Sequence, residues 1–282
     1  MLTRPTIEAV VRAALIEDAP WGDLTVELAI PSELETATRI IAREDGVFAG
    51  GEIVRETFRQ VDERVRVTEL VADGTAFRAG EVLGRVNGPA RGVLTGERVA
   101  LNFAQRLSGI ATLTSRFVAA VAHTSARIAD TRKTTPGLRA LEKHAVRVGG
   151  GSNHRFGLSD AIMVKDNHLA ALGAVDPAST TAALQHLRER AGHTTSIIVE
   201  VDRLDQLDAV LDSNVTGVLL DNFSTDDLAT AVDRIAGRVV AEASGGVTLN
   251  TVAAIAESGV DVISVGQLTH GARALDLGLD AD

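Results

Sequence analysis

The residues best suited to chemistry form a basic cluster in the middle of an acidic chain. Between residues 130 and 165 the sequence holds seven Lys or Arg against three acids, whereas the whole chain of 282 residues has a formal net charge of -10. The segment 128–137, IADTRKTTPG, places Arg132 and Lys133 directly after an apolar run. Arg can hold a carboxylate through two parallel hydrogen bonds, and Lys is a compact charge suited to phosphate. The cluster therefore predicts a pocket for a small ligand with several negative charges.

Three more residues of this window extend the cluster. His154 and Arg155 follow the glycine-rich turn GGGSN, and Lys165 ends the apolar run AIMV. The alternative is that each cation pairs with a nearby carboxylate such as Glu200 or Asp221, a structural use that remains open for any single residue.

The other basic residues of the window lie at helical spacing. Arg139, Lys143 and Arg147 stand at i, i+4 and i+8, which predicts one solvated face of a helix. We therefore leave these three out of the predicted pocket.

The elements that must position the cluster are alternating strands and helices. Six β-branched runs, at 126–131, 161–166, 196–201, 217–222, 239–244 and 261–266, alternate with helical stretches, a pattern typical of a parallel sheet. The polar residues that close four runs, Glu200, Asp221, Ser244 and Gly266, are 21, 23 and 22 positions apart. This regular repeat predicts an α/β barrel, with a doubly wound open sheet as the alternative. Six clear strands, with one more concealed, do not make a regular eightfold barrel.

In a barrel the carboxyl ends of the strands share one mouth, so their polar residues predict a single site. Glu200 and Asp221 could bind ribose hydroxyls, coordinate Mg²⁺ or stabilise a cationic sugar, or serve only as structural carboxylates. In EASGGVTLN, Ser244, Gly245 and Gly246 follow a strand and precede a helical stretch. Backbone N–H groups at a helix N-terminus can hold a phosphate, although the two glycines could equally serve a tight turn.

The first 107 residues have a different pattern, in which short strands, glycine turns and helices follow one another. This pattern predicts a smaller α+β domain. No Pro, Ser or Gly linker follows it, which favours two tightly docked halves. Trp21 is predicted to anchor the N-terminal helix, with no chemical role. His168 is predicted to have a local structural role, because no regular zinc-ligand spacing surrounds it.

Composition excludes several classes of protein. The chain has no cysteine, which excludes disulfides and thiolate sites. A pI near 5.2 and aromatic content of 3% argue against a nucleic-acid surface. No stretch approaches a signal peptide or a membrane span, so we expect a cytoplasmic protein without membrane contact.

Several segments, taken in order, resemble one known family. They are EDAPWGDLT, GERVALNFAQRLSGIATLT, DTRKTTPGLRALEKHAVRVGGGSNHRFGLSD, KDNH, VEVD, LLDN, EASGGV and VGQLTH, between about residue 15 and residue 279. This series is similar to quinolinate phosphoribosyltransferase, also called nicotinate-nucleotide pyrophosphorylase (carboxylating). The block from DTRKTTPGLR to GGGSNHR is the most specific part of the resemblance, whereas LLDN alone would mean little. His144 departs from the family, which often has tyrosine there.

The resemblance implies a reaction and a set of residues. Members transfer the phosphoribosyl group of phosphoribosyl pyrophosphate (PRPP) to quinolinate, a pyridine dicarboxylate, and release pyrophosphate and CO₂ to give nicotinate mononucleotide in NAD biosynthesis. By motif, the dicarboxylate pocket would be lined by Arg98, Arg132, Lys133, His154 and Arg155. Lys165 would contact PRPP, Glu200 and Asp221 would lie near the ribose and its Mg²⁺, and the 5′-phosphate would be held by Ser244, Gly245, Gly246, Gly266 and His270. The residues implied nearest to the chemistry are Lys133, Lys165, Glu200 and Asp221.

The resemblance also implies an architecture. It comprises an N-terminal α/β sandwich domain at 1–107, an incomplete barrel of about seven strands at 108–270, and a segment at 271–282 that returns to the first domain. Members are homodimers in which the N-terminal domain of one subunit covers the barrel mouth of the other, with Arg98 crossing over. Mg²⁺ with PRPP is the implied cofactor, and no organic cofactor is expected.

Three alternatives remain open from the sequence. One is a paralogue of the same fold that uses another heterocyclic acid, such as those associated with molybdate transport. A second is a barrel aldolase that uses Lys165 as a Schiff-base nucleophile. The third is a phosphoribosyl-binding sensor without activity.

Overall fold

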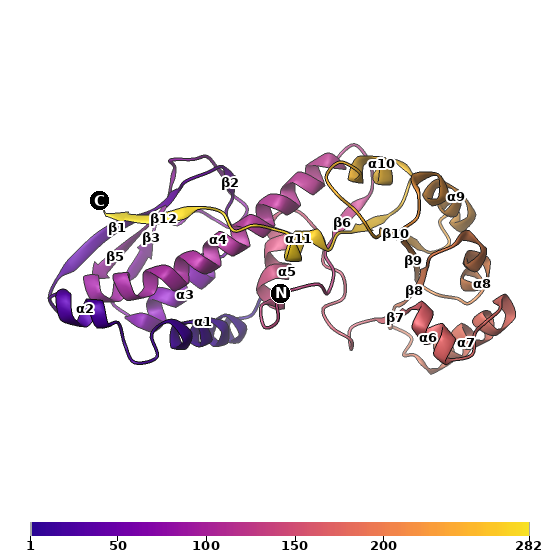
Figure 1. Cartoon of the computed structure of the whole chain (residues 1–282), viewed down its shortest axis with the longest axis horizontal. Coiled ribbons are helices and arrows are strands. Elements are labelled where there is room, and N and C mark those ends of the chain that lie inside the picture. The colour runs from indigo at the N-terminus through magenta and orange to yellow at the C-terminus, as the bar shows by residue number, and fades with distance from the viewer. Residues whose placement is uncertain (1, 282) are drawn as a thin grey trace. The chain divides into compact units, whose positions relative to one another are not determined.

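The computed structural model describes residues 2–281, which form two compact units (Figure 1). Within the described residues, one unit comprises residues 2–115, 134–150 and 268–281, and the other comprises residues 116–133 and 151–267. The domain division at 107/108 and 270/271 stays a prediction. The units differ from it by grouping residues 108–115, 134–150 and 268–270 with the N-terminal part. Among residues 2–281, no helix is both long and apolar enough to cross a membrane.

The first unit is built on an antiparallel sheet with strand order β12-β1-β5-β3. Its strands are β1 (Glu35–Ala42), β3 (Arg66–Thr68), β5 (Val82–Pro89) and β12 (Leu277–Ala281), and a separate pair is formed by β2 (Gly46–Val47) and β4 (Ala76–Phe77). Its helices are α1 (Arg4–Asp18), α2 (Leu24–Ala29), α3 (Gly51–Val61), the start of α4 (Ala90–Ala120), α5 (Arg139–Val148) and α11 (Gln267–His270), whose first residue belongs to the other unit. In Figure 1 the helices α3 and α4 lie along this sheet.

Alternating burial explains the packing of the first unit. In β1 the side chains of Thr38, Ile40 and Ala42 are buried while their neighbours are more exposed, the two-residue period of a strand with one face on a core. Phe48 and Phe58, at most 1% exposed, fill the same core. The unit is therefore held by a mixed aromatic and aliphatic core.

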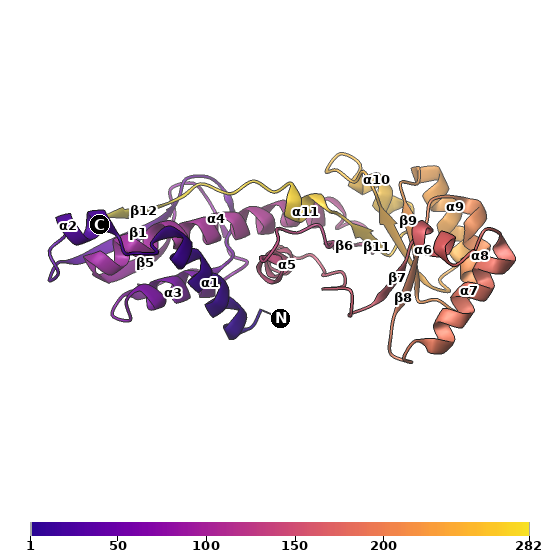
Figure 2. The same cartoon turned by 60° about the horizontal axis from the view of Figure 1, so that its bottom comes forward.

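The last strand, β12, pairs antiparallel with β1 and so joins the C-terminal segment to the N-terminal sheet (Figure 2). Leu277 stands opposite Ala42, and Ala281 stands opposite Thr38. Backbone hydrogen bonds with an edge strand satisfy groups that would otherwise be open to another chain.

Helix α5 corrects one prediction about the basic window. Lys143, predicted on a solvated face, is only 3% exposed, and Glu142 beside it is fully buried. Glu142 accepts hydrogen bonds from Arg106 of α4 at 2.8 Å and from the Thr135 hydroxyl at 2.8 Å. The helical spacing was right, but the helix is buried at Lys143 as well as at Glu142. Arg147 is exposed as predicted.

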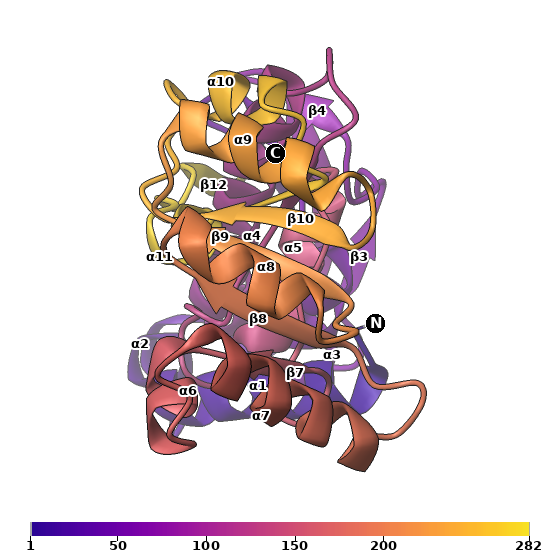
Figure 3. The same ribbon diagram turned by 90° about the vertical axis from the view of Figure 1, so that its right-hand side faces the viewer.

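The second unit contains one parallel sheet with the order β6-β11-β10-β9-β8-β7. Its strands are β6 (Arg127–Ala129), β7 (Ile162–Val164), β8 (Ile197–Val201), β9 (Gly217–Asp221), β10 (Val240–Ser244) and β11 (Val262–Ser264). Its helical elements are the end of α4, α6 (Asp166–Ala171), α7 (Pro177–Arg190), the 3₁₀ turn η1 (Leu204–Gln206), α8 (Leu207–Leu211), α9 (Thr225–Ile235) and α10 (Val252–Glu257). Figure 3 shows α7, α8 and α9 covering one face of β8, β9 and β10.

The strand order confirms an incomplete α/β barrel. From β7 to β11 each strand pairs with the next in sequence, without the reversal of a doubly wound sheet, and β6 then follows β11. The concealed further strand is reduced to Ser152, whose N–H donates to Ile128 O at 2.7 Å and whose carbonyl accepts from Asp130 N at 3.1 Å. One residue of parallel pairing beside β6 explains why no seventh apolar run is visible in the sequence.

Candidate active site

The carboxyl ends of the parallel strands carry most of the predicted site residues. Lys165 directly follows β7, Glu200 lies one residue before the end of β8, and Asp221 and Ser244 are the last residues of β9 and β10. The register places Glu200 beside Leu219 and Asp221 beside Ser244. Because partners on adjacent parallel strands project from the same face, Glu200, Asp221 and Ser244 share one side of the sheet.

Arg155 and Arg132 place two positive charges near each other in this unit. Burial lowers the pKa of the Arg155 guanidinium, and the positive charge of Arg132 lowers it further. An arginine keeps its proton in proteins, so two charged guanidiniums are held within electrostatic reach of each other. Such an arrangement favours binding of an anion. Lys133, the next residue along the chain, is exposed.

The segment with His154 and Arg155 is tied to β6 by a buried acid. Asp130 has no exposed surface and accepts hydrogen bonds from the backbone N–H of His154 at 2.8 Å and from the Asn153 amide at 2.6 Å. Arg155 donates from Nη1 to Ala161 O at 2.9 Å. Asp130 was not among the predicted site residues, although its position after an apolar strand and before the Arg-Lys pair is a usable signal.

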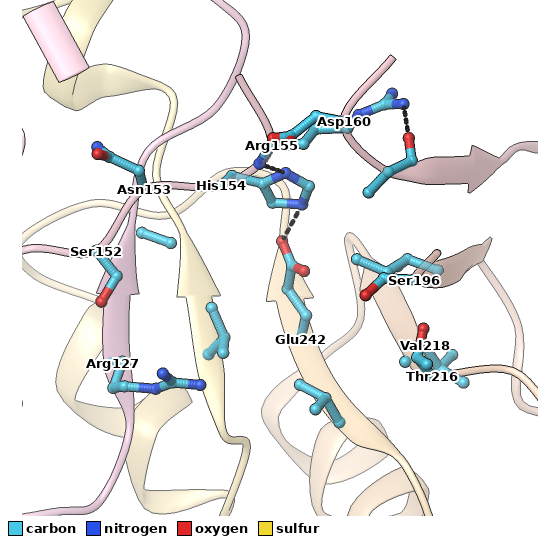
Figure 4. Close-up of a pocket in the computed structure, with 16 residues that line it drawn as sticks. Arg127, Ser152, Asn153, His154, Arg155, Asp160, Ser196, Thr216, Val218 and Glu242 are labelled. Carbon is cyan, nitrogen blue, oxygen red and sulfur yellow. Dashed lines mark hydrogen bonds and ion pairs between the residues drawn. The ribbon is translucent and has the colours of Figure 1, made fainter. Parts of the chain in front are cut away.

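A cavity of about 380 Å³ opens beside this segment, inside the second unit (Figure 4). Its walls include His154, Arg155, Arg127, Asp160 and Glu242. In Figure 4 the ring of His154 lies between the backbone of Arg155 and the carboxylate of Glu242. The structure thus brings two of the predicted ligand residues, His154 and Arg155, onto one cavity.

A second cavity, also about 380 Å³, contains the predicted carboxylates Glu200 and Asp221. Asp166, Asp202 and Arg203 add to its lining. Lys165 Nζ donates to Glu200 Oε2, so the predicted pairing of a site lysine with a barrel acid does occur. The cationic wall, at His154 and Arg155, thus lines one cavity, and the acidic wall, at Glu200 and Asp221, lines another.

This acidic wall is the place to test for a divalent cation. Among residues 2–281 no group of three or more His, Cys, Asp or Glu could hold a metal ion. Glu200 and Asp221 are two carboxylates, a donor set that fits Mg²⁺ completed by water and substrate phosphate oxygens.

The glycine loop after β10 differs in one respect from the prediction. Gly245 and Gly246 have φ angles of 90° and 60°, and α10 begins only at Val252, so their N–H groups do not belong to a helix N-terminus. A Cβ on Gly245 would lie 2.1 Å from Asn222 Oδ1, which explains the glycine by close approach. The positive φ angles show that the backbone of this loop favours glycine, while its phosphate-binding role stays a prediction. Gly266 directly precedes the short helix α11.

Two of the predicted site residues belong to the first unit. Arg98 lies in α4 and His270 ends α11, and both are exposed. Their assignment to the site stays a prediction.

Two other residues have different outcomes. The anchoring role of Trp21 is wrong, because that side chain is 94% exposed. The local role of His168 is confirmed, since its Nδ1 accepts the Lys165 N–H at 2.9 Å at the start of α6. Glu242 and Glu142 are buried acids that the sequence analysis missed; an acid inside the apolar strand VVAEAS was the signal for the first.

The open parallel barrel with a charged carboxyl edge defines an α/β-barrel enzyme domain. Residues 23–108 match the family model "Quinolinate phosphoribosyl transferase, N-terminal domain", and residues 110–280 match its C-terminal domain. The chain belongs to the quinolinate phosphoribosyltransferase family.

Named relatives and solved structures agree with that membership. A nicotinate-nucleotide pyrophosphorylase (carboxylating) of Mycobacterium leprae is 45% identical over 276 residues, covering 96% of this chain and 95% of the relative. A probable enzyme of the same name from Bacillus subtilis is 43% identical over 265 residues, covering 94% and 90%. The crystal structure of NadC from Streptococcus pyogenes matches with a TM-score of 0.94 at 38% identity, covering 100% of this chain and 98% of that one.

Proposed function

We propose that this chain transfers the phosphoribosyl group of PRPP to quinolinate with loss of CO₂, giving nicotinate mononucleotide and pyrophosphate in NAD biosynthesis. Relatives at 41–45% identity are named for quinolinate phosphoribosyl transfer or for the carboxylating pyrophosphorylase. The observation in this chain that carries the proposal is the pairing of Arg132 with Arg155, because two neighbouring guanidiniums suit the two carboxylates of quinolinate.

The dicarboxylate would bind at the cationic wall. Arg132, Lys133 and Arg155 would hold its carboxylates, with His154 beside them on the cavity. Arg98 would join this set from a second subunit. Bidentate contacts fix the plane of the ring, which orients its nitrogen toward the sugar.

PRPP would bind at the acidic wall and the glycine loop. Lys165 would contact the pyrophosphate, and Ser244, Gly245, Gly246, Gly266 and His270 would hold the 5′-phosphate. Glu200 and Asp221 would face the ribose and hold the Mg²⁺ that enters with PRPP, which supplies neutralising charge to the leaving group. No organic cofactor is required.

The chemistry then follows from charge complementarity. The bond from C1′ to the pyrophosphate oxygen breaks with its electron pair leaving on oxygen, and the ring nitrogen donates a pair to C1′. Glu200 and Asp221 stabilise the positive charge that develops on the sugar, while Lys133 and Lys165 balance the anions around it. The C2 carboxylate leaves as CO₂, its bonding pair enters the N-ribosylated pyridinium, and a proton then replaces it at C2.

We include a homodimer in this proposal. Trp21, Leu24 and Leu28 are 94%, 71% and 79% exposed at the N-terminal helices, an apolar surface that a second copy could cover. Arg98 would then cross to the neighbouring barrel. We place the enzyme in the cytoplasm, without nucleic-acid or membrane partners.

An acceptor comparison tests this function against a paralogue that uses another acid. The purified protein with Mg²⁺ and PRPP is given quinolinate, nicotinate or another heterocyclic acid, and the nucleotide product is quantified. We expect rapid turnover only with quinolinate, because nicotinate lacks the second carboxylate. Preference for a different acid would reject the proposed acceptor and leave the family assignment in place.

A further inference from the structure

Glu242 is a buried acid that the proposed chemistry does not use. It lies within β10, only 4% exposed, and faces the cavity that His154 and Arg155 also line (Figure 4). The Ser264 hydroxyl of β11 donates to Glu242 Oε1. The same carboxylate oxygen lies 3.4 Å from Nε2 of His154.

The presence of this carboxylate needs a reason. A buried negative charge is costly in itself, and beside a pocket for a dianion it also repels the ligand. A hydrogen bond from one serine does not explain why this position should be ionisable at all. The group that gains from the charge is the imidazole that faces it.

The other ring nitrogen of His154, Nδ1, already accepts a hydrogen bond. His154 Nδ1 accepts the backbone N–H of Arg155 at 2.7 Å. A nitrogen that accepts a hydrogen bond carries no proton, so in the neutral ring the proton resides on Nε2. Nε2 is the atom that faces Glu242.

We propose that Glu242 is a positioning residue that keeps the proton of His154 on Nε2 and aims that N–H into the cavity. At 3.4 Å the contact with Glu242 is longer than an ordinary hydrogen bond, and Nε2 itself is buried, so a ligand carboxylate must enter deeply enough to reach this N–H and share it. A lone pair at this atom would instead repel an anion. This inference rests on the proposed function for its ligand, but the tautomer itself does not.

The kinetic test is Glu242→Gln, which keeps the size of the side chain and removes its charge. Loss of positioning should raise the KM for quinolinate about tenfold, the worth of one charge-assisted hydrogen bond, with the KM for PRPP unchanged. If Glu242 acted only as a nearby charge, its removal would lower the KM for quinolinate. The two roles therefore predict opposite signs, and an unchanged or lowered KM overturns the proposal while leaving the proposed function intact.

Matched variants separate positioning from folding. Glu257→Gln removes the carboxylate that faces His123 Nε2 at 3.0 Å on the surface, and should change neither KM. Ser264→Ala loosens Glu242 without altering charge, and should raise the quinolinate KM in the same direction; if Glu242→Gln does not fold, this variant decides. His154→Gln, whose amide N–H can occupy the place of Nε2, should retain more quinolinate affinity than His154→Asn.

The tautomer is measured independently of turnover. ¹⁵N NMR of the unliganded full chain, with His154 assigned through His154→Gln, should show Nε2 protonated and Nδ1 unprotonated in the neutral ring. A protonated Nδ1 would overturn the proposal even if the enzyme is active. If the wild-type protein makes no product from quinolinate, the proposed function fails, and the NMR result still decides the positioning of His154.

Discussion

Lys165 Nζ, at the end of β7, is bonded to Glu200 Oε2 on the neighbouring strand β8, so the cation and the anion of the predicted site are already paired. In the proposed reaction, an incoming pyrophosphate would share Lys165 with this carboxylate. The ion pair thus holds the lysine in place and at the same time competes with the ligand.

Glu200→Gln tests this competition. Without the negative charge, pyrophosphate should bind about two- to fivefold more tightly, because a partly exposed ion pair is worth about 1 kcal/mol or less. The kcat should fall about 10- to 100-fold, since the developing sugar cation loses a stabilising charge. Calorimetry with pyrophosphate and steady-state kinetics measure the two effects. Asp202→Asn, which removes an exposed acid of the same cavity, is the control, and weaker pyrophosphate binding by Glu200→Gln would contradict the interpretation.

Arg155→Ala should separate the two substrates. Loss of a guanidinium that holds a carboxylate is expected to raise the KM for quinolinate about 10- to 100-fold, with the KM for PRPP little changed. Arg132→Ala should behave in the same way, and Arg190→Ala, on the exposed end of α7, serves as the control. Equal losses for quinolinate and PRPP would count against a dicarboxylate pocket at these arginines.

The buried pair of Glu142 and Arg106 should dominate the stability of α5. Glu142 is fully buried and also accepts the Thr135 N–H at 3.0 Å, so Glu142→Ala leaves Arg106 without its carboxylate. We expect a loss of ~3–5 kcal/mol in the free energy of unfolding. Denaturant unfolding measures this loss. For Glu69→Ala, which breaks an exposed ion pair with Arg85, the loss in the free energy of unfolding should be at most about 1 kcal/mol. Similar losses of unfolding free energy in the two variants would show that burial does not make the Glu142–Arg106 pair more important for stability.

The two glycines after Ser244 should differ in their tolerance of alanine. Both have positive φ, so each substitution carries a backbone strain of ~1–2 kcal/mol. Gly245→Ala must also displace Asn222, while a Cβ on Gly246 meets nothing within 4 Å. We expect Gly245→Ala to be less stable than Gly246→Ala by a further ~1–3 kcal/mol in thermal unfolding. Equal melting temperatures would mean that Asn222 moves away freely.

Asp73 should make stability depend on acid pH. Burial alone would raise the pKa of this carboxyl, but hydrogen bonds from His144 and from the N–H groups of Gly51 and Gly50 outweigh it and lower the pKa below its ordinary 3.8. A pKa that is lower in the folded state stabilises the protein above about pH 4 and loses that effect as pH falls through the folded value. Asp73→Asn should remove this part of the acid sensitivity, which unfolding measured between about pH 2 and 6 would reveal. An identical pH dependence in both proteins would contradict it.

The repeating parts of the fold could be predicted from the sequence because their signal is periodic. All six apolar runs became strands, and the polar residues at their ends became one edge of the barrel. The further strand at Ser152 could not be predicted, since a single bridged residue has no period. Lys143 was misplaced for a related reason: helical spacing identifies a face but does not say what packs against it.

The site residues also fall into a group that could be predicted from the sequence and a group that could not. Arg132, Lys165 and Glu200 stood out because charge at the end of an apolar run is unusual and local in sequence. Arg155 stood out because it follows a glycine-rich turn. The contacts that position such residues join distant segments, as Glu242 and His154 do, and no spacing rule links residues 88 positions apart. In the sequence, the visible sign of such a contact was an acidic residue inside an apolar run, as Glu242 is in VVAEAS.

The most direct test of the proposed reaction follows the carboxylate at C2. Quinolinate labelled with ¹³C at that carboxylate is incubated with the protein, Mg²⁺ and PRPP, and labelled CO₂, pyrophosphate and nicotinate mononucleotide are quantified together. We predict equal amounts of the three products, with no label left in the nucleotide. Label retained in the nucleotide, or pyrophosphate released without CO₂, would contradict a decarboxylating phosphoribosyl transfer.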